Sequence, residues 1–350
     1  MPPTSVTIVA GGDVMAQRTI KLAARWHAAR GSAYEGWSGL LEDLKPAFRN
    51  CDLAFCNLET PILPQMTDPL VAGASEEEYP KFFGPTALVT ALQDAGLTLL
   101  SVANNHAHDM GAGGIDGTVE TLQGANLSAA GLLLDGEAQV PEMTLGRWTM
   151  RVLGATTKMN KTLPHGFTRY DVQSVEAGDS EALVRQVEVA DKAGRPAIVS
   201  LHWGREWGTG PDETQRSLAH HLCEAGATLV LGHHSHVAQP VEVYRTRDGR
   251  TCLIAWSLGN LLAFEADHPN ANLGLLLRIR LEADAQGRPR VAAATWQPTW
   301  SRREGECIRV IPLDSGTDAA RRALADPACQ RELRAAEQRV GPRTIKVPND

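Results

Sequence analysis

A run of three histidines follows a buried-strand pattern in the second half of the chain. The apolar segment Ala227–Leu231 leads directly into Gly232-His233-His234-Ser235-His236. A strand of this kind delivers the next side chains to the rim of a sheet, and imidazole nitrogens are common ligands of transition metals. A pair of surface histidines is the alternative interpretation of the run taken alone. The run predicts a metal site if other strand ends supply further ligands.

Other strand-like segments also end in residues that bind metals or move protons. They are Asp13 after 6–10, Glu59 after 52–56, Asn105 and His106 after 97–103, and His202 after 197–201. In open α/β sheets, ligands bind at the carboxyl ends of the strands, so we expect these residues to converge. Carboxylate, imidazole and amide oxygen suit one or two divalent ions such as Mn²⁺, Zn²⁺ or Fe²⁺.

The strands that must position these residues alternate with helix-like segments along most of the chain. Helical spacing occurs at 16–30, 40–48, 86–95, 113–124, 181–193 and 214–225. Such alternation is typical of parallel strands joined by crossover helices. Beyond residue 273, strand-like segments at 275–281 and 290–295 predict antiparallel pairing in a second sheet. An Ala-rich, charged segment at 318–338 predicts a final helix.

The length of the chain, 350 residues, is compatible with one large α/β domain with appendages. We find no internal repeat and no linker, and we expect a single domain over residues 1–350. Its motif-bearing core spans 6–265, and antiparallel strands and a helix follow at 270–340. Residues 60–80 are rich in Pro, Asp, Glu and Gly without periodicity, which predicts a long loop of the kind that is commonly functional.

Composition excludes several classes of protein. The net charge is −7 and the acidic residues are scattered, so the chain lacks the basic patch of a nucleic-acid binder. The six cysteines lie far apart without a Cys-x-x-Cys pair, which argues against a zinc ribbon or a redox pair and favours reduced thiols.

Targeting signals are not visible in the sequence. The first residues run at once into the strand-like segment 6–10, without the basic and apolar regions of a signal peptide. No window approaches the roughly 18 consecutive apolar residues of a membrane-spanning helix. We therefore expect a cytoplasmic protein without a membrane segment.

The strings around the strand ends resemble the CapA family, which is named for capsule and poly-γ-glutamate biosynthesis. They are Gly12-Asp13-Val14-Met15, Asn57-Leu58-Glu59-Thr60-Pro61, Ala103-Asn104-Asn105-His106-Ala107-His108-Asp109-Met110-Gly111, His202-Trp203-Gly204-Arg205-Glu206, Gly232-His233-His234-Ser235-His236 and Ser257-Leu258-Gly259-Asn260. A weaker match spans Gly154–Asn160, where Lys158 departs from the pattern. The family belongs to the calcineurin-like metallophosphoesterase superfamily. The resemblance implies an α/β fold, a metallophosphatase-like β-sandwich of two mixed sheets flanked by helices.

The resemblance also implies roles for individual residues. It places the metal ligands at Asp13, Glu59, Asn105, His202, His234 and His236. Glu59 stands where the superfamily has its bridging carboxylate, and His106 stands where it has an acid or oxyanion stabiliser. His233 is not an expected ligand, because the spacing of His234 and His236 fits the superfamily better.

One departure from the superfamily concerns the number of metal ions. Phosphoesterases of the superfamily usually carry Asp-x-His after the first strand, whereas this chain has Met15 at the His position. Glu59 also replaces the usual Asp. A single strongly held metal is therefore an alternative to a binuclear site.

Residues beside these motifs are candidates for proton transfer and for substrate binding. They are Asp13 and Asp109 with His106 for proton transfer, and Arg205, Glu206, Lys158 and Asn160 for substrate binding. Asp109 either orders His106 or caps the following helix. Arg205 and Glu206 face a substrate or form an ion pair at the rim, and Lys158 binds an anion or is an ordinary surface lysine.

Hydrolysis is the expected reaction, because a metal held by such ligands activates water near neutral pH and polarises a carbonyl or phosphoryl oxygen. The substrate is then a phosphoester or, as the family name suggests, a polyglutamate or peptide with a γ-glutamyl amide. Epimerisation of a peptide residue is an alternative, with Asp13 and a His as opposed bases, as in family members that act as lasso-peptide epimerases. A non-catalytic metal-binding role in a polymer-biosynthesis complex is a third.

Overall fold

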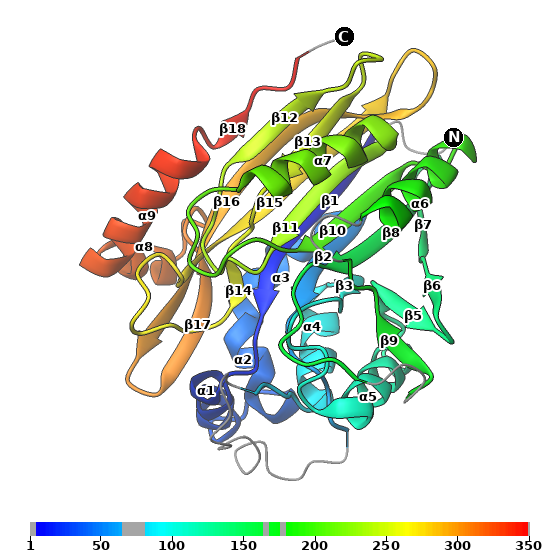
Figure 1. Cartoon of the computed structure of the whole chain (residues 1–350). Helices are drawn as coiled ribbons and strands as arrows, with labels where there is room; N and C mark the ends of the chain where they lie inside the picture. The colour runs from blue at the N-terminus through cyan, green and yellow to red at the C-terminus, as the bar shows by residue number, and fades with distance from the viewer. Residues whose placement is uncertain (1–4, 65–80, 164–167, 176–179, 349–350) are drawn as a thin grey trace.

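The computed structural model describes residues 5–64, 81–163, 168–175 and 180–348 (Figure 1). Most of the predicted loop at 60–80 lies outside these residues. Within them, two large mixed sheets pack face to face and helices cover their outer faces, as the sequence predicts.

The first sheet holds nine strands and carries the first half of the candidate site. Along its main path the strands are β17 (Cys307–Pro312), β16 (Pro289–Glu304), β15 (Leu273–Ala283), β1 (Ser5–Val14), β2 (Leu53–Leu58), β3 (Leu99–Ser101) and β4 (Ser128–Ala130). Off this path, β14 (Asn260–Leu262) pairs with β1 and β18 (Thr344–Ile345) pairs with β16. Strands β1 to β4 are parallel, so their carboxyl ends share one edge.

The prediction of a separate second sheet after residue 273 is wrong. Strands β15 and β16 are antiparallel to each other, as expected, but β15 also pairs antiparallel with β1 from Ser5↔Glu282 to Ala10↔Leu277. The hydrophobic pattern of β15 specifies which face is buried but does not say which strand lies beside it. The C-terminal strands therefore extend the first sheet.

The second large sheet carries the remaining ligand strands. Its order is β12 (Val241–Arg245), β13 (Thr251–Ala255), β11 (Ala227–His233), β10 (Ala197–His202), β8 (Trp148–Thr156) and β7 (Glu142–Leu145). The four inner strands are parallel, and antiparallel hairpins close both edges. Asp248 and Gly249 lie in the turn between β12 and β13, with Gly249 at φ 88°, and the Asp-Gly dipeptide is a hairpin signal in the sequence.

A third, small sheet was not predicted. It consists of β6 (Glu137–Gln139), β5 (Leu132–Leu134) and β9 (Tyr170–Val172). Asp135 and Gly136 connect β5 to β6 with φ values of 51° and 83°, the geometry that Asp-Gly favours in a tight hairpin. This dipeptide was the available signal in the sequence.

Helices complete the outer layers of the sandwich. The first sheet is covered by α1 (Arg18–Ala28), α2 (Trp37–Leu41), α3 (Lys45–Arg49), α4 (Thr86–Ala95) and α5 (Gly111–Gly124), with 3-10 turns at Tyr34–Gly36 and Glu42–Leu44. The second is covered by α6 (Glu181–Lys192) and α7 (Glu213–Ala225). Gly96 and Gly226 end α4 and α7, with φ values of 110° and 124° that favour glycine.

The single helix predicted at 318–338 is two helices, α8 (Asp318–Leu324) and α9 (Pro327–Val340). Asp326 accepts a hydrogen bond from the first turn of α9, and Pro327 occupies that turn, where its missing N–H does no harm. Both helices pack on the β15–β17 side of the core between the two large sheets.

The inner faces of the large sheets form the main core. Ile8, Phe55, Ile198 and Leu231 are fully buried there, each contributing about 1.5–3 kcal/mol by leaving water. Their strand neighbours on the opposite faces pack under the helices. This double burial fixes the strands in register and makes their ends a rigid support for a site.

One cysteine pair departs from the expectation of reduced thiols. Cys223 in α7 and Cys252 in β13 form a disulfide, while Cys51, Cys56, Cys307 and Cys329 are free. The two partners are remote in sequence, and only the packing of α7 on the second sheet brings them together.

None of the helices in the described part of the chain is both long enough and apolar enough to cross a membrane.

Candidate metal centre

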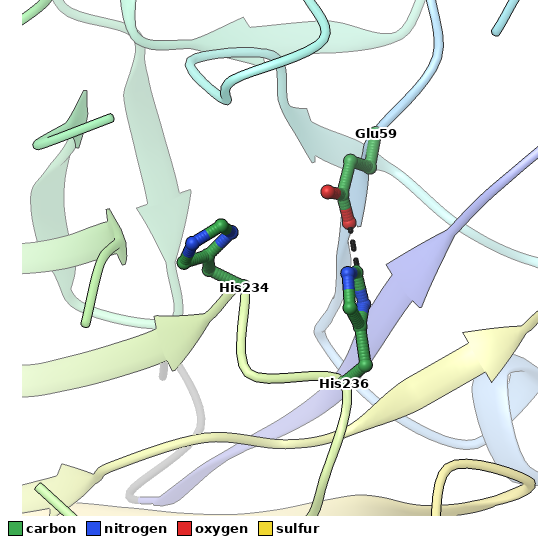
Figure 2. Close-up of side chains that lie close together, drawn as sticks. All are labelled: Glu59, His234 and His236. Atoms are coloured by element: carbon green, nitrogen blue, oxygen red, sulfur yellow. Dashed lines mark ion pairs between the residues drawn. The ribbon is translucent and has the colours of Figure 1, made fainter. Parts of the chain in front are cut away.

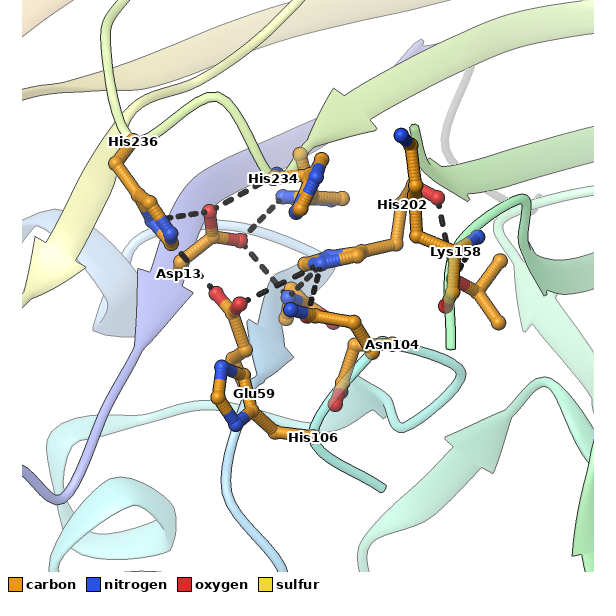
Figure 3. A network of polar contacts seen from close by, with 12 residues as sticks. Asp13, Glu59, Asn104, His106, Lys158, His202, His234 and His236 are labelled. Atoms are coloured by element: carbon orange, nitrogen blue, oxygen red, sulfur yellow. Dashed lines mark hydrogen bonds and ion pairs between the residues drawn. The ribbon is translucent and has the colours of Figure 1, made fainter. Parts of the chain in front are cut away.

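The carboxyl ends of strands from both large sheets meet at one place. Figure 3 shows that Asp13, Glu59, His202, His234 and His236 point toward a common centre. All five residues are buried, with an exposed fraction that does not exceed 4%. The convergence expected from the strand ends is therefore present in the fold.

Asp13 lies at the end of β1 and is held by donors on two sides. Asn57 Nδ2 donates to Oδ1 at 2.8 Å, and the backbone N–H of His234 donates to Oδ2 at 3.1 Å. Nδ1 of His233 lies 3.2 Å from Oδ1, and Nδ1 of His236 lies 3.6 Å from Oδ2. Burial by itself raises the pKa of Asp13, but the hydrogen bonds of His233 and His236 outweigh it and hold the pKa well below its usual range.

Glu59 follows β2 and presents a different environment. Both carboxylate oxygens are buried and accept no hydrogen bond from any residue that the structure describes. The nearest imidazole nitrogens are Nε2 of His202, 3.4 Å from Oε1, and Nδ1 of His236, 3.8 Å from Oε2. Burial raises the pKa of Glu59 to about 8.

Glu59 is common to two sets of ligand atoms. One set joins Glu59 to His234 and His236 (Figure 2), and the other joins Asp13, Glu59 and His202; within each set the atoms lie within 4.8 Å of one another. A buried carboxylate without donors is costly, and a cation beside it removes that cost. The donor set therefore fits one or two divalent ions.

The histidines of the centre differ in protonation. Burial lowers the pKa of His202 and of His234 well below the usual range, which keeps both imidazoles in the neutral form that binds metals. Burial also lowers the pKa of His236, but attraction to Glu59 and a hydrogen bond to Asp13 outweigh it and raise the pKa to about 10. His236 and Glu59 are thus the groups that must release protons when a cation binds.

Asn105 is placed to complete the ligand set. Nε2 of His202 donates to Oδ1 of Asn105 at 2.7 Å. Both atoms are of the kind that would coordinate a divalent ion, and His202 Nε2 would have to be unprotonated to do so. Asn105 also donates from Nδ2 to Oδ1 of Asn160 at 3.3 Å, which orients its amide.

The backbone after β11 is strained at the two ligand histidines. His234 has φ 85° and His236 has φ 57°, values that cost roughly 1–3 kcal/mol each for residues other than glycine. Gly232, two residues before His234, is packed so tightly that a Cβ there would lie 2.1 Å from the carbonyl oxygen of Trp256. Close packing of this loop therefore maintains a conformation that directs both imidazoles to Glu59.

His106 and Asp109 form a hydrogen-bonded pair next to these ligands. Nδ1 of His106 lies 2.7 Å from Oδ2 of Asp109, which also accepts from the backbone N–H of Phe82 at 2.7 Å. The Phe82 ring covers His106 with centroids 4.3 Å apart. Of the two alternatives for Asp109, the structure shows the contact with His106, and α5 has no side-chain cap.

The predicted substrate-binding residues lie at the rim and differ in their contacts. Asn160 Nδ2 is 3.5 Å from Nε2 of His106. Lys158, labelled in Figure 3, is exposed. Its charge is among the causes that lower the pKa of His234. The charge of Glu206 helps to raise the pKa of Glu59. Arg205 is exposed beside Glu206.

Several residues of the centre were missed in the sequence. Asn57 connects Asp13 to His202 Nδ1, 3.3 Å away, and Asn260 Oδ1 accepts from Nδ1 of His236 at 3.1 Å. Both stand inside recognised strings, so their amide side chains were the available signal. Phe82 carried no signal, because it follows a segment without periodicity.

Sequence relatives of this chain are involved in capsule and polymer biosynthesis, according to their names. The family model described as "Bacterial capsule synthesis protein PGA_cap" matches residues 7–265. The chain is 28% identical to the PGA biosynthesis protein CapA of Bacillus subtilis (strain 168) over 281 residues, 79% of this chain and 68% of that protein. It is 27% identical to the capsule biosynthesis protein CapA of Bacillus anthracis over 277 residues, 73% of this chain and 59% of that protein.

A probable polyglutamine synthesis accessory protein of Mycobacterium tuberculosis is 30% identical over 155 residues, 41% of each chain. The alignments thus span only part of each relative. Among solved structures, NAD nucleotidase of Haemophilus influenzae matches with a TM-score of 0.48 and 10% identity, over 95% of this chain and 67% of that one. Purple acid phosphatase PPD1 of yellow lupin matches with a TM-score of 0.33 and 10% identity, over 88% and 54%. Both likenesses are distant.

Proposed function

The chain belongs to the bacterial capsule synthesis protein family PGA_cap, and from this premise we propose that it is a metal-dependent hydrolase of glutamyl amide bonds in a polymer or peptide. The names of its relatives, which refer to PGA, capsule and polyglutamine synthesis, support a glutamyl chain as the substrate. Metal-activated hydrolysis of an amide accounts for both the ligand set and the proton donor beside it.

The observation that carries the proposal is the environment of Glu59. Its two buried oxygens lack donors among the described residues, while ligand atoms from Asp13, His202, His234 and His236 surround them. A buried carboxylate that served only to stabilise the fold would have its oxygens satisfied by hydrogen-bond donors. We therefore assign Glu59 as the ligand shared by the two sets.

A divalent ion held by these residues would polarise the substrate carbonyl and supply a water nucleophile near neutral pH. The remaining steps belong to the side chains. Nδ1 of His106 donates to Asp109, and Nε2 lies 3.5 Å from Nδ2 of Asn160 on the opposite side of the ring. We assign Nε2 of His106 to protonation of the departing amine, with Asp109 stabilising the imidazolium that precedes the transfer.

Asp13 is better suited to the ligand role than to that of a base. Both of its oxygens are engaged, and its pKa is held well below the usual range by His233 and His236 against the effect of burial. A base of that kind does not abstract a Cα proton effectively. This geometry supports hydrolysis over epimerisation with Asp13 as one of two bases.

The rim supplies contacts for an acidic substrate. Lys158 is placed to bind a carboxylate near His234, and Asn160 to hydrogen-bond an amide near His106. Glu206, on the Glu59 side, would disfavour a second carboxylate there. We infer that the side-chain carboxylates of the substrate lie on the Lys158 side.

The test combines elemental analysis with product identification. The purified protein is loaded with Mn²⁺, Zn²⁺ or Fe²⁺ and incubated in D₂O with a γ-linked glutamate oligomer, and separately with a chromogenic phosphodiester. We expect shorter glutamate oligomers without deuterium at Cα. Deuterium uptake without cleavage would replace hydrolysis by epimerisation, and turnover of the phosphodiester alone would replace the amide by a phosphoester.

Two variants, Glu59→Gln and His106→Asn, separate metal binding from proton transfer. The first removes a ligand charge and the second a proton donor, so we expect loss of metal with the first and loss of turnover with metal retained in the second. A protein that binds no divalent ion, or Glu59→Gln with unchanged metal content and turnover, would overturn the proposal.

A further inference from the structure

A second cavity adjoins the metal centre on the far side of Trp207. It has a volume of about 530 Å³ and is bounded by the loop at 263–272, by Arg303 at the end of β16 and by one face of α9. Its size falls in the range of roughly 300–1,000 Å³ that is usual for ligand pockets. We call this cavity the distal pocket.

The wall of the distal pocket is connected to His236 in two ways. His268 in the wall stacks on Trp207, with ring centroids 3.8 Å apart and planes 2° apart, and Trp207 lies 5.2 Å from His236. Asn260 accepts from His236 Nδ1 at 3.1 Å and donates to the carbonyl of Ala271, in the same loop, at 2.9 Å. A molecule bound in the pocket therefore contacts the same loop that positions His236 through Asn260.

Both polar and apolar side chains line the distal pocket, and two of them are arginines. Arg303 and Arg331 are exposed and line the cavity from opposite elements, β16 and α9. Phe264 and Trp300 supply aromatic surface, and the guanidinium of Arg303 lies 5.4 Å from the Phe264 ring. Guanidinium groups above an apolar wall suit a carboxylate on a flexible aliphatic side chain.

The acidic residues of the wall are already engaged within the protein. Gln17 donates to Glu265, and Asp326 accepts from the first turn of α9 at 2.8 Å. Glu332 accepts from the backbone N–H of Asn272 at 3.2 Å, and burial raises its pKa. These contacts hold the acidic side chains against the protein, where Glu265 and Asp326 are half-buried and Glu332 is buried, whereas Arg303 and Arg331 are exposed to a ligand.

We propose that the distal pocket binds a carboxylate-bearing segment of a glutamyl chain whose scissile amide lies at the metal centre. Cleavage rests on the proposed function, whereas binding of the chain does not. An extended α-linked chain advances roughly 3.3–3.6 Å per residue, and a γ-linked chain, with two more backbone atoms per residue, advances further, so a few residues reach from the pocket across Trp207 to His236. The enzyme thus selects an acidic chain over a small amide or ester.

The experiment measures binding of a fluorescently labelled γ-glutamate oligomer by anisotropy, with the metal-loaded protein and an equally long glutamine oligomer as the uncharged comparison. Two double variants change the arginines of the pocket. Arg303→Glu/Arg331→Glu reverses their charge, and Arg303→Lys/Arg331→Lys retains it. Arg185→Glu/Arg245→Glu makes the same charge change at exposed arginines that line neither site. Ala335→Trp fills the pocket from α9 without changing its charge.

We expect the charge reversal and Ala335→Trp to weaken binding about tenfold or more, and the lysine variant and the distant control to change it less than about threefold. Equal binding of the two oligomers, or equal losses in the distant control and the charge reversal, would overturn the proposal. The metal content is measured for every variant. Binding that depends on the arginines without any cleavage would refute the proposed function alone, whereas cleavage that is indifferent to all pocket variants would refute the distal pocket alone.

Discussion

Two regions at opposite ends of the same strands use charged residues in contrasting ways. The metal centre lies at the carboxyl ends, and a cleft of about 490 Å³ lies at the amino ends, next to Pro196, Thr228 and Thr251. In this opposite cleft, Arg250 pairs with Asp248 at 2.7 Å and Arg288 with Asp284 at 2.8 Å.

The difference lies in burial and in compensation. The ion pairs of the opposite cleft are partly exposed and each charge has a partner, so they contribute about 0–1 kcal/mol each to stability. Glu59 is fully buried and its oxygens accept no hydrogen bond within the described part of the chain. A cluster rich in charge therefore indicates a site only where burial leaves a charge uncompensated.

The largest expected effect follows from Glu59→Gln. Loss of the shared ligand should reduce metal affinity and turnover by at least about 100-fold, more than removal of an outer-sphere partner does. The metal-free variant should nevertheless be more stable than the metal-free wild type at pH 8, by about 1–3 kcal/mol, because a buried carboxylate is replaced by a neutral amide. Calorimetric titration with Mn²⁺ and chemical denaturation measure both effects. Equal stability together with unchanged affinity would remove the contrast between the two regions.

The pH dependence should have the same origin. The pKa of Glu59 is raised by burial from 4.5 to about 8, so the metal-free folded protein holds a proton that the unfolded chain releases. Stability of the metal-free protein should therefore fall as the pH rises from about 5 to 8. Metal affinity should change in the opposite direction, rising over this interval, because binding displaces that proton.

Titrations in buffers of different ionisation enthalpy count the protons released on metal binding, with Glu59→Gln as the control. If Glu59→Gln releases as many protons on metal binding as the wild type, the released proton comes from a residue other than Glu59.

A smaller effect is expected for Asp109→Asn. The amide keeps the shape of the side chain but stabilises the His106 imidazolium less, so kcat should fall about 10–100-fold while metal content is retained. The pH profile of kcat distinguishes this role from a structural one. It should shift in Asp109→Asn but not in Asp212→Asn, the same change at the N-cap of α7, where Asn still accepts the capping hydrogen bond. Loss of metal in Asp109→Asn would contradict the assignment.

The smallest effect is expected in the opposite cleft. Arg288→Ala removes a partner of Asp284 but exposes both positions to water, so the free energy of unfolding should change by less than about 1 kcal/mol. Metal content and turnover should stay at the wild-type values. A loss of several kcal/mol, measured by denaturation, would show that the ion pairs of this cleft are not ordinary surface pairs.

The sequence predicted that the candidate ligands converge, because each of them follows a strand. A buried strand has a clear hydrophobic pattern, and the residues after parallel strands share one edge of a sheet, so Asp13, His202 and His234 could be grouped without coordinates. The alternation of strands and helices predicted parallel strands with crossover helices, and the family resemblance implied the two sheets. Asn57 and Asn260 stand in the recognised strings, but their contacts with His202 and His236 depend on how the two sheets face each other.

Tertiary structure alone decided which strands are neighbours, because pattern specifies a buried face but not the element that covers it. It joined β15 to β1 and brought Cys223 beside Cys252.

The sequence by itself therefore determined the chemistry of this protein: the residue types that bind a divalent ion and the order in which strands deliver them. The fold decided the electrostatic state of those residues. Burial between the sheets raises the pKa of Glu59, and the surrounding histidines lower that of Asp13 against the same burial. These opposite shifts in two carboxyl groups arise from long-range contacts, which sequence spacing does not encode.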